Sequence, residues 1–294
     1  MIKTALLFTV CFLFLNTTNL FAEETYDMSI LDDQVNRSDL KPEVMKSFGK
    51  GRRINPSYAK NRGMISTGVS PKFDEDLKGR GIDEYWAKDY RKVRGREAYH
   101  GGIDIPAPRG TPILAVASGT VVAKFMNEQN PKGIEIIIRH SPTDTNLPMW
   151  VYTQYTHLKE MPDIKIGQKI DMGQVIGKTS NTGISGREAK RRHGNSFSNK
   201  KRKDFGHDRR DALHLGAFYS KSKKYMINEK MLIPVDAYWM DPNALYKKTS
   251  PYDSVSLKAL SNKEKEIPIP CMLENGEVRP KDTKVIWPYI CKIK

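Results

Sequence analysis

A histidine and a carboxylate lie four residues apart in the glycine-rich stretch YHGGIDIP, as His100 and Asp104. In an extended strand, side chains at even spacing share one face, so both groups would point the same way. Gly102 stands between them and leaves room. Such a pair can be a salt bridge, a hydrogen-bonded pair on a strand, or two ligands of one metal ion. The pair alone leaves these interpretations open.

Two later histidines also stand in segments that read as strands, His157 in YTQYTHL and His214 in DALHLGAF. The alternation around His214 predicts that Leu213 and Leu215 face the core, whereas Ala212 and His214 face the opposite side. Catalytic zinc takes about three protein ligands from histidine and acidic side chains and keeps one position open. A zinc site would therefore require a fold that brings these strands together.

The segment that carries most of these residues predicts strands. Its β-branched or alternating runs are TPILAVASGTVVAKF, IEIIIRH, MWVYTQYTHL and IKIGQKIDMGQVIGKTS, and Gly, Pro, Asn and Asp separate them. Short strands with a turn signal every ten residues or so are typical of an all-β sandwich or barrel. We therefore predict a mostly β fold with an antiparallel sandwich or barrel-like core and irregular N- and C-terminal extensions.

Composition divides the chain into four parts after an N-terminal leader. The leader has one lysine, an apolar run of about a dozen residues and a small residue before two acids, which is the pattern of a secretory signal peptide. The apolar run is shorter than the roughly 20 residues of a membrane span. The expected parts are a signal peptide at 1–22, an irregular lead-in at 23–97 with a helix at 83–93, a β domain at 98–247 with a basic insertion at 187–210, and a tail at 248–294.

The number of cysteines and the net charge are consistent with an exported protein. Cys11 leaves with the signal peptide, so Cys271 and Cys291 remain and predict a disulfide in an oxidising compartment, the alternative being two free thiols. The formal net charge of +15 favours anionic partners, and export disfavours nucleic acid among them. We expect a periplasmic or extracellular protein with no transmembrane segment once the leader is removed.

The order of the motifs resembles the lysostaphin and LytM type of zinc metallopeptidase, which cleaves peptidoglycan peptides. YHGGIDIPAPRGTP is similar to the H-x-G-x-D segment of that family, YTQYTHL to its Y-x-H-L segment, and IKIGQKIDMGQVIG to its G-Q-x-V-x-x-G-Q-x-I-G segment. DALHLGAF occupies the place of its late H-x-H strand. The resemblance covers roughly residues 98–220 and, more weakly, 233–246.

The resemblance implies a catalytic zinc ion held by His100, Asp104 and His214. It implies that His157 lies near the zinc without binding it and hydrogen-bonds the developing oxyanion or helps to move a proton. Family members usually carry a second catalytic histidine where this chain has Ala212, so we expect slow turnover.

The register of the late strand leaves an alternative, in which His214 aligns with that second histidine and Gly216 takes the ligand position. We prefer the first register because it keeps a hydrophobic residue on each side of the ligand and preserves the zinc site.

Three functions are compatible with this sequence. The first is an exported zinc endopeptidase that cuts peptidoglycan stem peptides or cross-links, with the basic insertion 187–210 contacting an anionic wall or lipid surface. The second is a catalytically impaired protein of the same fold that binds the wall or activates other wall hydrolases. The third is a carrier domain, because ASGTVV and IKIGQKIDMGQVIG also resemble biotinyl and lipoyl hairpins. The chain lacks the modifiable lysine beside methionine that a carrier needs between those segments.

Overall fold

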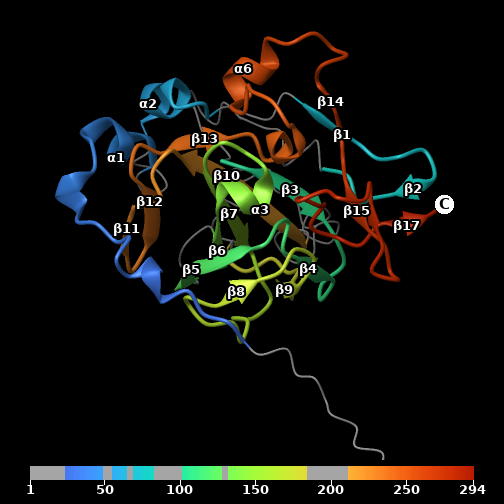
Figure 1. Cartoon of the computed structure of the whole chain (residues 1–294), viewed down its shortest axis with the longest axis horizontal. Helices are drawn as coiled ribbons and strands as arrows, with labels where there is room; N and C mark the ends of the chain where they lie inside the picture. The colour runs from blue at the N-terminus through green and yellow to red at the C-terminus, as the bar shows by residue number, and fades with distance from the viewer. Residues whose placement is uncertain (1–23, 49–54, 65–68, 83–100, 128–131, 184–210) are drawn as a thin grey trace, which may run out of the picture.

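A computed structural model describes most of the chain (Figure 1), and the described residues are 24–48, 55–64, 69–82, 101–127, 132–183 and 211–294. The expected signal peptide, the helix expected at 83–93, His100 and the basic insertion 187–210 lie outside them. Within the described residues, no helix is long and apolar enough to cross a membrane.

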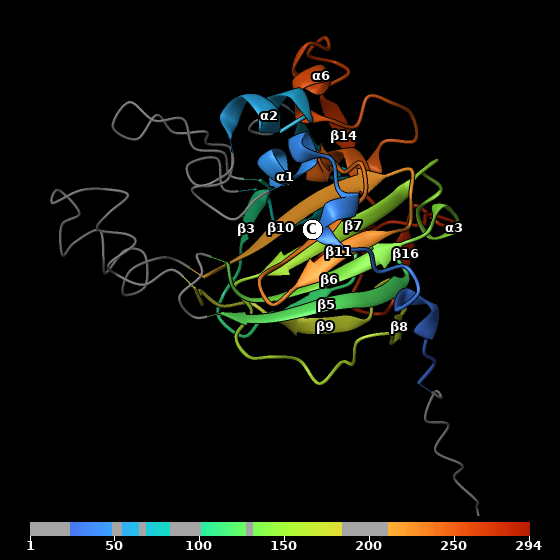
Figure 2. The same ribbon diagram turned by 90° about the vertical axis from the view of Figure 1, so that its left-hand side faces the viewer.

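The centre of the molecule is a seven-stranded sheet whose neighbouring strands are all antiparallel, which confirms the predicted fold class. The strand order is β13-β10-β7-β6-β5-β8, and β3 pairs with the first half of β10. Figure 2 shows β5, β6, β7 and β10 stacked side by side. The strands are β3 (Ile103–Pro106), β5 (Gly119–Asn127), β6 (Gly133–His140), β7 (Trp150–Thr156), β8 (Lys169–Ile170), β10 (Ala212–Ser220) and β13 (Tyr238–Met240).

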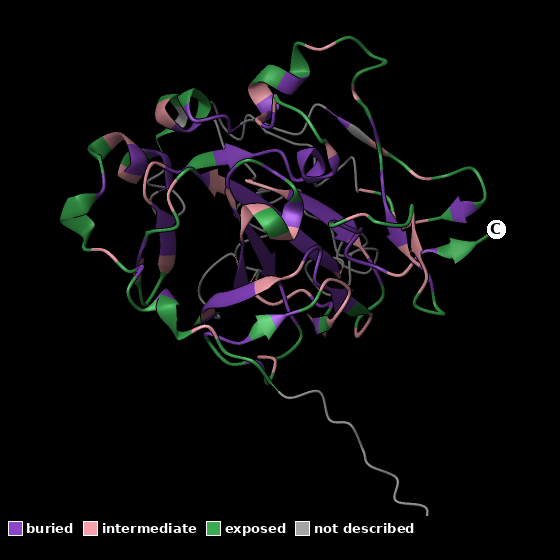
Figure 3. Ribbon diagram, in the orientation of Figure 1, coloured by how far each residue is buried: buried purple, intermediate pink, exposed green. Residues whose placement is uncertain are grey.

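Each face of this sheet packs against its own hydrophobic core, and Figure 3 shows the central strands almost wholly buried. Ile136 and Leu215 belong to the first core, together with Ile113 of β4 (Pro112–Leu114) and Ile176 of β9 (Val175–Lys178). Ile137, Tyr152 and Phe218 belong to the second core, on the opposite face. Strand alternation puts Asp104 and His214 on the face of this second core.

The N-terminal lead-in is more ordered than its polar composition predicted. It forms η1 (Met28–Ile30), η2 (Arg37–Asp39), α1 (Pro42–Phe48) and α2 (Pro56–Asn61). Ile30 and Val44 are fully buried in the second core, and Phe48 stacks on Trp239 with ring centroids 4.4 Å apart. These apolar residues attach the segment, which we expected to be irregular, to the sheet.

A buried ion pair also attaches the lead-in. Arg139 of β6 donates from Nη1 to Asp33 Oδ2 at 2.6 Å, and the two side chains are only 3% and 2% exposed. Lys223 Nζ lies 2.9 Å from the other carboxylate oxygen. The hairpin of β11 (Tyr225–Asn228) and β12 (Met231–Pro234) covers the same end of the sheet.

The C-terminal tail pairs with residues 70–78 instead of remaining irregular. Strand β14 (Glu266–Pro268) runs parallel to β1 (Ser70–Lys72), and β17 (Lys292–Ile293) runs antiparallel to β2 (Leu77–Lys78), as Figure 1 shows in red beside cyan. A disulfide joins Cys271 to Cys291. The other short elements are α3 (Pro142–Thr145), η6 (Pro242–Tyr246), α6 (Ser254–Lys258), β15 (Cys271–Met272) and β16 (Val278–Arg279).

Candidate metal centre

Asp104 and His214 face each other on neighbouring antiparallel strands. They are direct partners in the pairing of β3 with β10, and His214 Nδ1 lies 3.1 Å from Asp104 Oδ1. Both residues are buried, at 3% and 6% exposure. A proton on Nδ1 makes this contact a charge-assisted hydrogen bond. Without that proton, both atoms offer lone pairs to one cation.

His157 completes this cluster from the end of β7. Its backbone has a φ of +64°, a left-handed conformation that is uncommon for a residue other than glycine and that often marks functional sites. Its Nδ1–H donates to the carbonyl oxygen of Thr182 at 2.8 Å, and this fixes the tautomer because a carbonyl can only accept. The lone pair of the neutral ring is therefore on Nε2, and the ring centroid lies 5.9 Å from that of His214.

Zinc fits this donor set. One ligand atom from each of Asp104, His157 and His214 can be chosen so that all three lie within 4.8 Å of one another. Two ligands of a tetrahedral zinc ion, each bonded at about 2.0–2.1 Å, are about 3.3 Å apart. The 3.1 Å between His214 Nδ1 and Asp104 Oδ1 is close to that spacing. A carboxylate with imidazoles is also a common protein ligand set for zinc.

Polar groups continue from this cluster across the sheet. The pairing register aligns Glu135 of β6, Thr156 of β7, His214 of β10 and Asp104 of β3 in one row on one face. Thr156 is fully buried, and its hydroxyl has no hydrogen-bond partner among the residues that the structure describes. Buried hydroxyl groups normally have a hydrogen-bond partner, so we expect a water or ligand atom beside Thr156 Oγ1.

The Glu135 carboxylate ends this row. It accepts a short hydrogen bond from the Gln154 side-chain amide and lies 3.9 Å from Lys132 Nζ. Burial raises the pKa of Glu135, while Lys132 and the Gln154 amide lower it. The main chain of Lys132 also supports the site, because its carbonyl accepts the backbone N–H of His157 at 3.0 Å.

A glycine allows the His214 ring to lie against the β3 segment. A Cβ atom at Gly102 would lie 2.7 Å from His214 Nε2 and 2.5 Å from the carbonyl oxygen of Leu215. Both separations are shorter than real Cβ contacts. The side chain of His214 therefore depends on the missing Cβ at Gly102.

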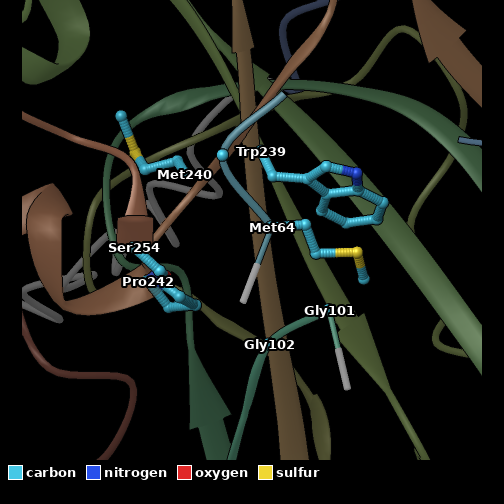
Figure 4. Close-up of a pocket in the computed structure, with 8 residues that line it drawn as sticks. Met64, Gly101, Gly102, Trp239, Met240, Pro242 and Ser254 are labelled. Atoms are coloured by element: carbon cyan, nitrogen blue, oxygen red, sulfur yellow. The ribbon is translucent and has the colours of Figure 1, made fainter. Parts of the chain in front are cut away.

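On its other side, this glycine segment borders a small pocket (Figure 4). Met64 and Trp239 line it beside Gly101 and Gly102, with Met240, Pro242 and Ser254 around them. Met64 and Trp239 also belong to the second core, which the N-terminal lead-in covers. The candidate centre and the packed lead-in thus share one face of the sheet, and the glycines lie between them.

The structure brings together three of the residues singled out in the sequence, Asp104, His157 and His214. His100 lies outside the described residues. Ala212 pairs with Pro106 and is 1% exposed, so it lies one pleat from His214 on the same face. His140 is fully buried in the sheet, where its Nδ1–H donates to the Ser118 carbonyl at 2.7 Å.

Glu135, Gln154 and Thr156 also lie on this face and were not expected from the sequence. A signal was present, because Glu135 interrupts the apolar run IEIII and the two others alternate with the apolar residues of YTQYTHL. Only the pairing register could show that all three share the face of His214.

Comparison with known proteins gives one family match. The profile described as Peptidase family M23 matches residues 98–194. Among curated proteins, the peptidoglycan DD-endopeptidase ShyA of Vibrio cholerae is 30% identical over 149 residues, which is 48% of this chain and 32% of that protein. The V. cholerae peptidoglycan DD-endopeptidase ShyC is 37% identical over 91 residues, 31% of this chain and 19% of that protein. The chain spans about a third or less of the length of these relatives.

Solved structures give weaker likenesses. The structure of LytU is 20% identical, with a TM-score of 0.36, over 67% of this chain and 97% of that one. The catalytic domain of lysostaphin from Staphylococcus simulans is 16% identical, with a TM-score of 0.30, over 58% of this chain and 93% of that one.

Proposed function

Because residues 98–194 match the profile of Peptidase family M23, we propose that the protein is an exported zinc endopeptidase that hydrolyses peptide bonds in peptidoglycan stem peptides or cross-links. The match confirms the family resemblance stated from the motifs. Two curated relatives are named as peptidoglycan DD-endopeptidases, which supports the choice of substrate.

The observation that carries the proposal is the buried pair of Asp104 and His214, with His157 beside it. We assign His100, Asp104 and His214 as the zinc ligands, and the opposition of His214 to Asp104 supports the register in which His214 is the ligand. Zinc at this site would polarise the scissile carbonyl and make a water more acidic. The described geometry also makes His157 a competing third ligand.

We assign His157 to proton transfer. The Thr182 carbonyl holds the proton of the ring on Nδ1, so Nε2 can accept a proton from the attacking water. Once protonated, the same nitrogen can donate to the developing oxyanion. Ala212 supplies no second imidazole, and a missing general base typically costs about 10²–10⁴-fold in rate. Slow turnover is the expected behaviour.

The second candidate is an impaired protein of the same fold that binds the wall or activates other wall hydrolases. Ala212 is the observation that favours it. Turnover separates the two candidates, whereas zinc retention does not, because a regulator could keep the metal.

The test combines metal analysis with digestion of purified peptidoglycan by the mature protein. We expect one zinc ion per chain and slow release of peptide fragments. Asp104→Ala and His214→Ala should lose both zinc and activity, whereas Glu229→Ala, an exposed acid in the turn between β11 and β12, should lose neither. His100→Ala should lose zinc and His157→Ala should keep it, and the reverse would make His157 the third ligand.

One further variant examines the missing imidazole. Ala212→His should raise the rate, because position 212 lies one pleat from His214 on the same face. A wild-type protein that is inert on peptidoglycan but binds it would favour the regulator. A wild-type protein without zinc would overturn the metal site.

Location and surface contacts belong to the same proposal. Peptidoglycan lies outside the cytoplasmic membrane, which agrees with the signal peptide expected at 1–22. The composition of 187–210 supports contact with an anionic wall or lipid surface, and such contacts weaken with salt. Deleting this insertion should reduce the binding of the protein to cell-wall sacculi at low salt.

A further inference from the structure

Arg109 lies in the turn that follows β3, and residues from two other segments fix its guanidinium group. Its Nη2 donates to Asn181 Oδ1 at 2.6 Å, and its Nε lies 3.4 Å from Asp211 Oδ1. The main chain joins the same segments, because Ala107 N–H donates to the Asp211 carbonyl and Gly110 N–H donates to the Thr179 carbonyl. These hydrogen bonds hold the turn 107–110 in place, and we call this turn the rim.

This rim adjoins the candidate metal centre. Pro106 of β3 pairs with Ala212 of β10, one row beyond the pairing of Asp104 with His214. Asp211 directly precedes β10, three residues before His214. At about 3.4 Å per residue along a strand, the rim begins about 10 Å from the centre. A peptide lying extended across the centre would cover that distance with about three residues.

Among the residues that the structure describes, only Asn181 and Asp211 accept hydrogen bonds from the Arg109 guanidinium group. Asn181 accepts a hydrogen bond from Nη2, and Asp211 accepts one from Nε. The N–H groups of Nη1 and the second hydrogen of Nη2 are therefore left as donors. Within the described part of the chain, Nη1 has no hydrogen-bond partner, and the side chain is 54% exposed. Two parallel N–H donors match the two oxygens of a carboxylate.

We propose that Arg109 is a specificity-determining residue that binds a carboxylate of the substrate peptide, two to three residues from the scissile bond. The inference rests on the proposed function and narrows its substrate class to peptides with a free carboxylate at that distance. Asn181 and Asp211 are positioning residues, because they bind Nη2 and Nε of the guanidinium group and leave Nη1 available to a ligand. Lysine at position 109 would keep the charge but lose the paired donors.

The test uses two synthetic stem-peptide analogues that are identical except that the carboxylates are free in one and amidated in the other. Binding and turnover are measured separately on the zinc-loaded mature protein. The wild type should prefer the free carboxylates by about tenfold, at the low end for a hydrogen-bonded charge because the arginine is half exposed. Arg109→Ala should abolish the preference through KM with little change in kcat, and Arg109→Lys should recover only part of it.

Arg279→Ala is the matched control, because Arg279 is also paired with acidic side chains, Asp76 and Glu277, but lies outside the central sheet. It should keep the full preference, and unchanged zinc content and thermal midpoint show that each variant is folded. A wild type without preference, or an Arg109→Ala variant that keeps it, overturns the inference even if both peptides are cleaved. Binding with preference but without turnover would refute the endopeptidase and leave the carboxylate site intact. A wild type that binds neither analogue would overturn both.

Discussion

Replacing Gly102 with alanine tests whether the missing Cβ is what allows His214 to occupy its place in the centre. The added atom would lie 2.7 Å from His214 Nε2 and 2.5 Å from the Leu215 carbonyl oxygen, whereas ordinary contacts begin at 3.4 Å. The ring would have to move by about 0.7 Å, and the β10 backbone by about 0.9 Å, to restore such contacts. Ligand distances in a metal site tolerate only about 0.2 Å.

We therefore expect Gly102→Ala to bind zinc at least about tenfold more weakly than the wild type, the lower end of what misplaced supporting groups cost. The strain should also lower the free energy of unfolding by about 1–3 kcal/mol. Competition with a chromophoric chelator measures the first effect, and denaturant titration of the zinc-free protein measures the second.

Gly81→Ala is the control, because a Cβ at Gly81 has no atom within 4 Å and the glycine is not in the left-handed region. It should leave both quantities unchanged. A Gly102→Ala protein with the zinc affinity of the wild type would refute the reasoning, because His214 would then not depend on this contact. A wild type that binds no zinc would instead refute the proposed metal site.

Three other predictions concern His140, His157 and the ion pair of Asp33 with Arg139. Burial lowers the pKa of His140 from 6.5 to about 4. Between these two pH values the unfolded chain binds a proton at this histidine and the folded protein does not. The contribution of His140 to the free energy of unfolding should be complete above pH 6.5 and fall by about 3 kcal/mol as the pH drops to 4. Denaturant titrations of His140→Asn should show a weaker dependence of the free energy of unfolding on pH over this range. Both His157→Gly and His157→Val lose the buried ring and its hydrogen bond, but at φ +64° the valine should lower the free energy of unfolding by about 1–2 kcal/mol more than the glycine in denaturant titrations, and peptidoglycan digestion should fail with both. Asp33→Ala should cost about 3 kcal/mol, because the buried Arg139 loses its nearer carboxylate and keeps only Asp27 at 3.9 Å, and calorimetry should show a smaller loss for Asp33→Leu combined with Arg139→Met.

The sequence predicted the strands of the core because their apolar residues repeat with the period of a sheet. In β10, Leu213 and Leu215 alternate with His214, and the structure buries both leucines in the first core. The same alternation predicted that Ala212 and His214 share a face. Local pattern was sufficient here because strand periodicity depends on neighbouring residues only.

The rest of the site depends on pairing between distant strands, which alternation along one strand does not encode. Glu135 looks like an interruption of an apolar strand until the register aligns it with Thr156 and His214. The ordered lead-in was missed for a related reason. Ile30 and Phe48 are isolated apolar residues in a polar segment, and only their contacts with the sheet show that they are part of a core.

The pairing of β10 with β3, β7 and β13 has a consequence for how the protein matures. Asp104 and His214 are 110 residues apart in the chain, so the two side chains meet only when the late strand β10 inserts between the earlier strands β3 and β7. Contacts between residues so far apart in sequence form slowly, because closing the long intervening loop costs conformational entropy before the contact forms. The cluster of Asp104, His157 and His214 therefore does not exist until β10 has paired with β3 and β7. Under the proposed function, zinc can bind only after β10 has paired with β3, so metal uptake by the refolding protein reports the completion of the central sheet.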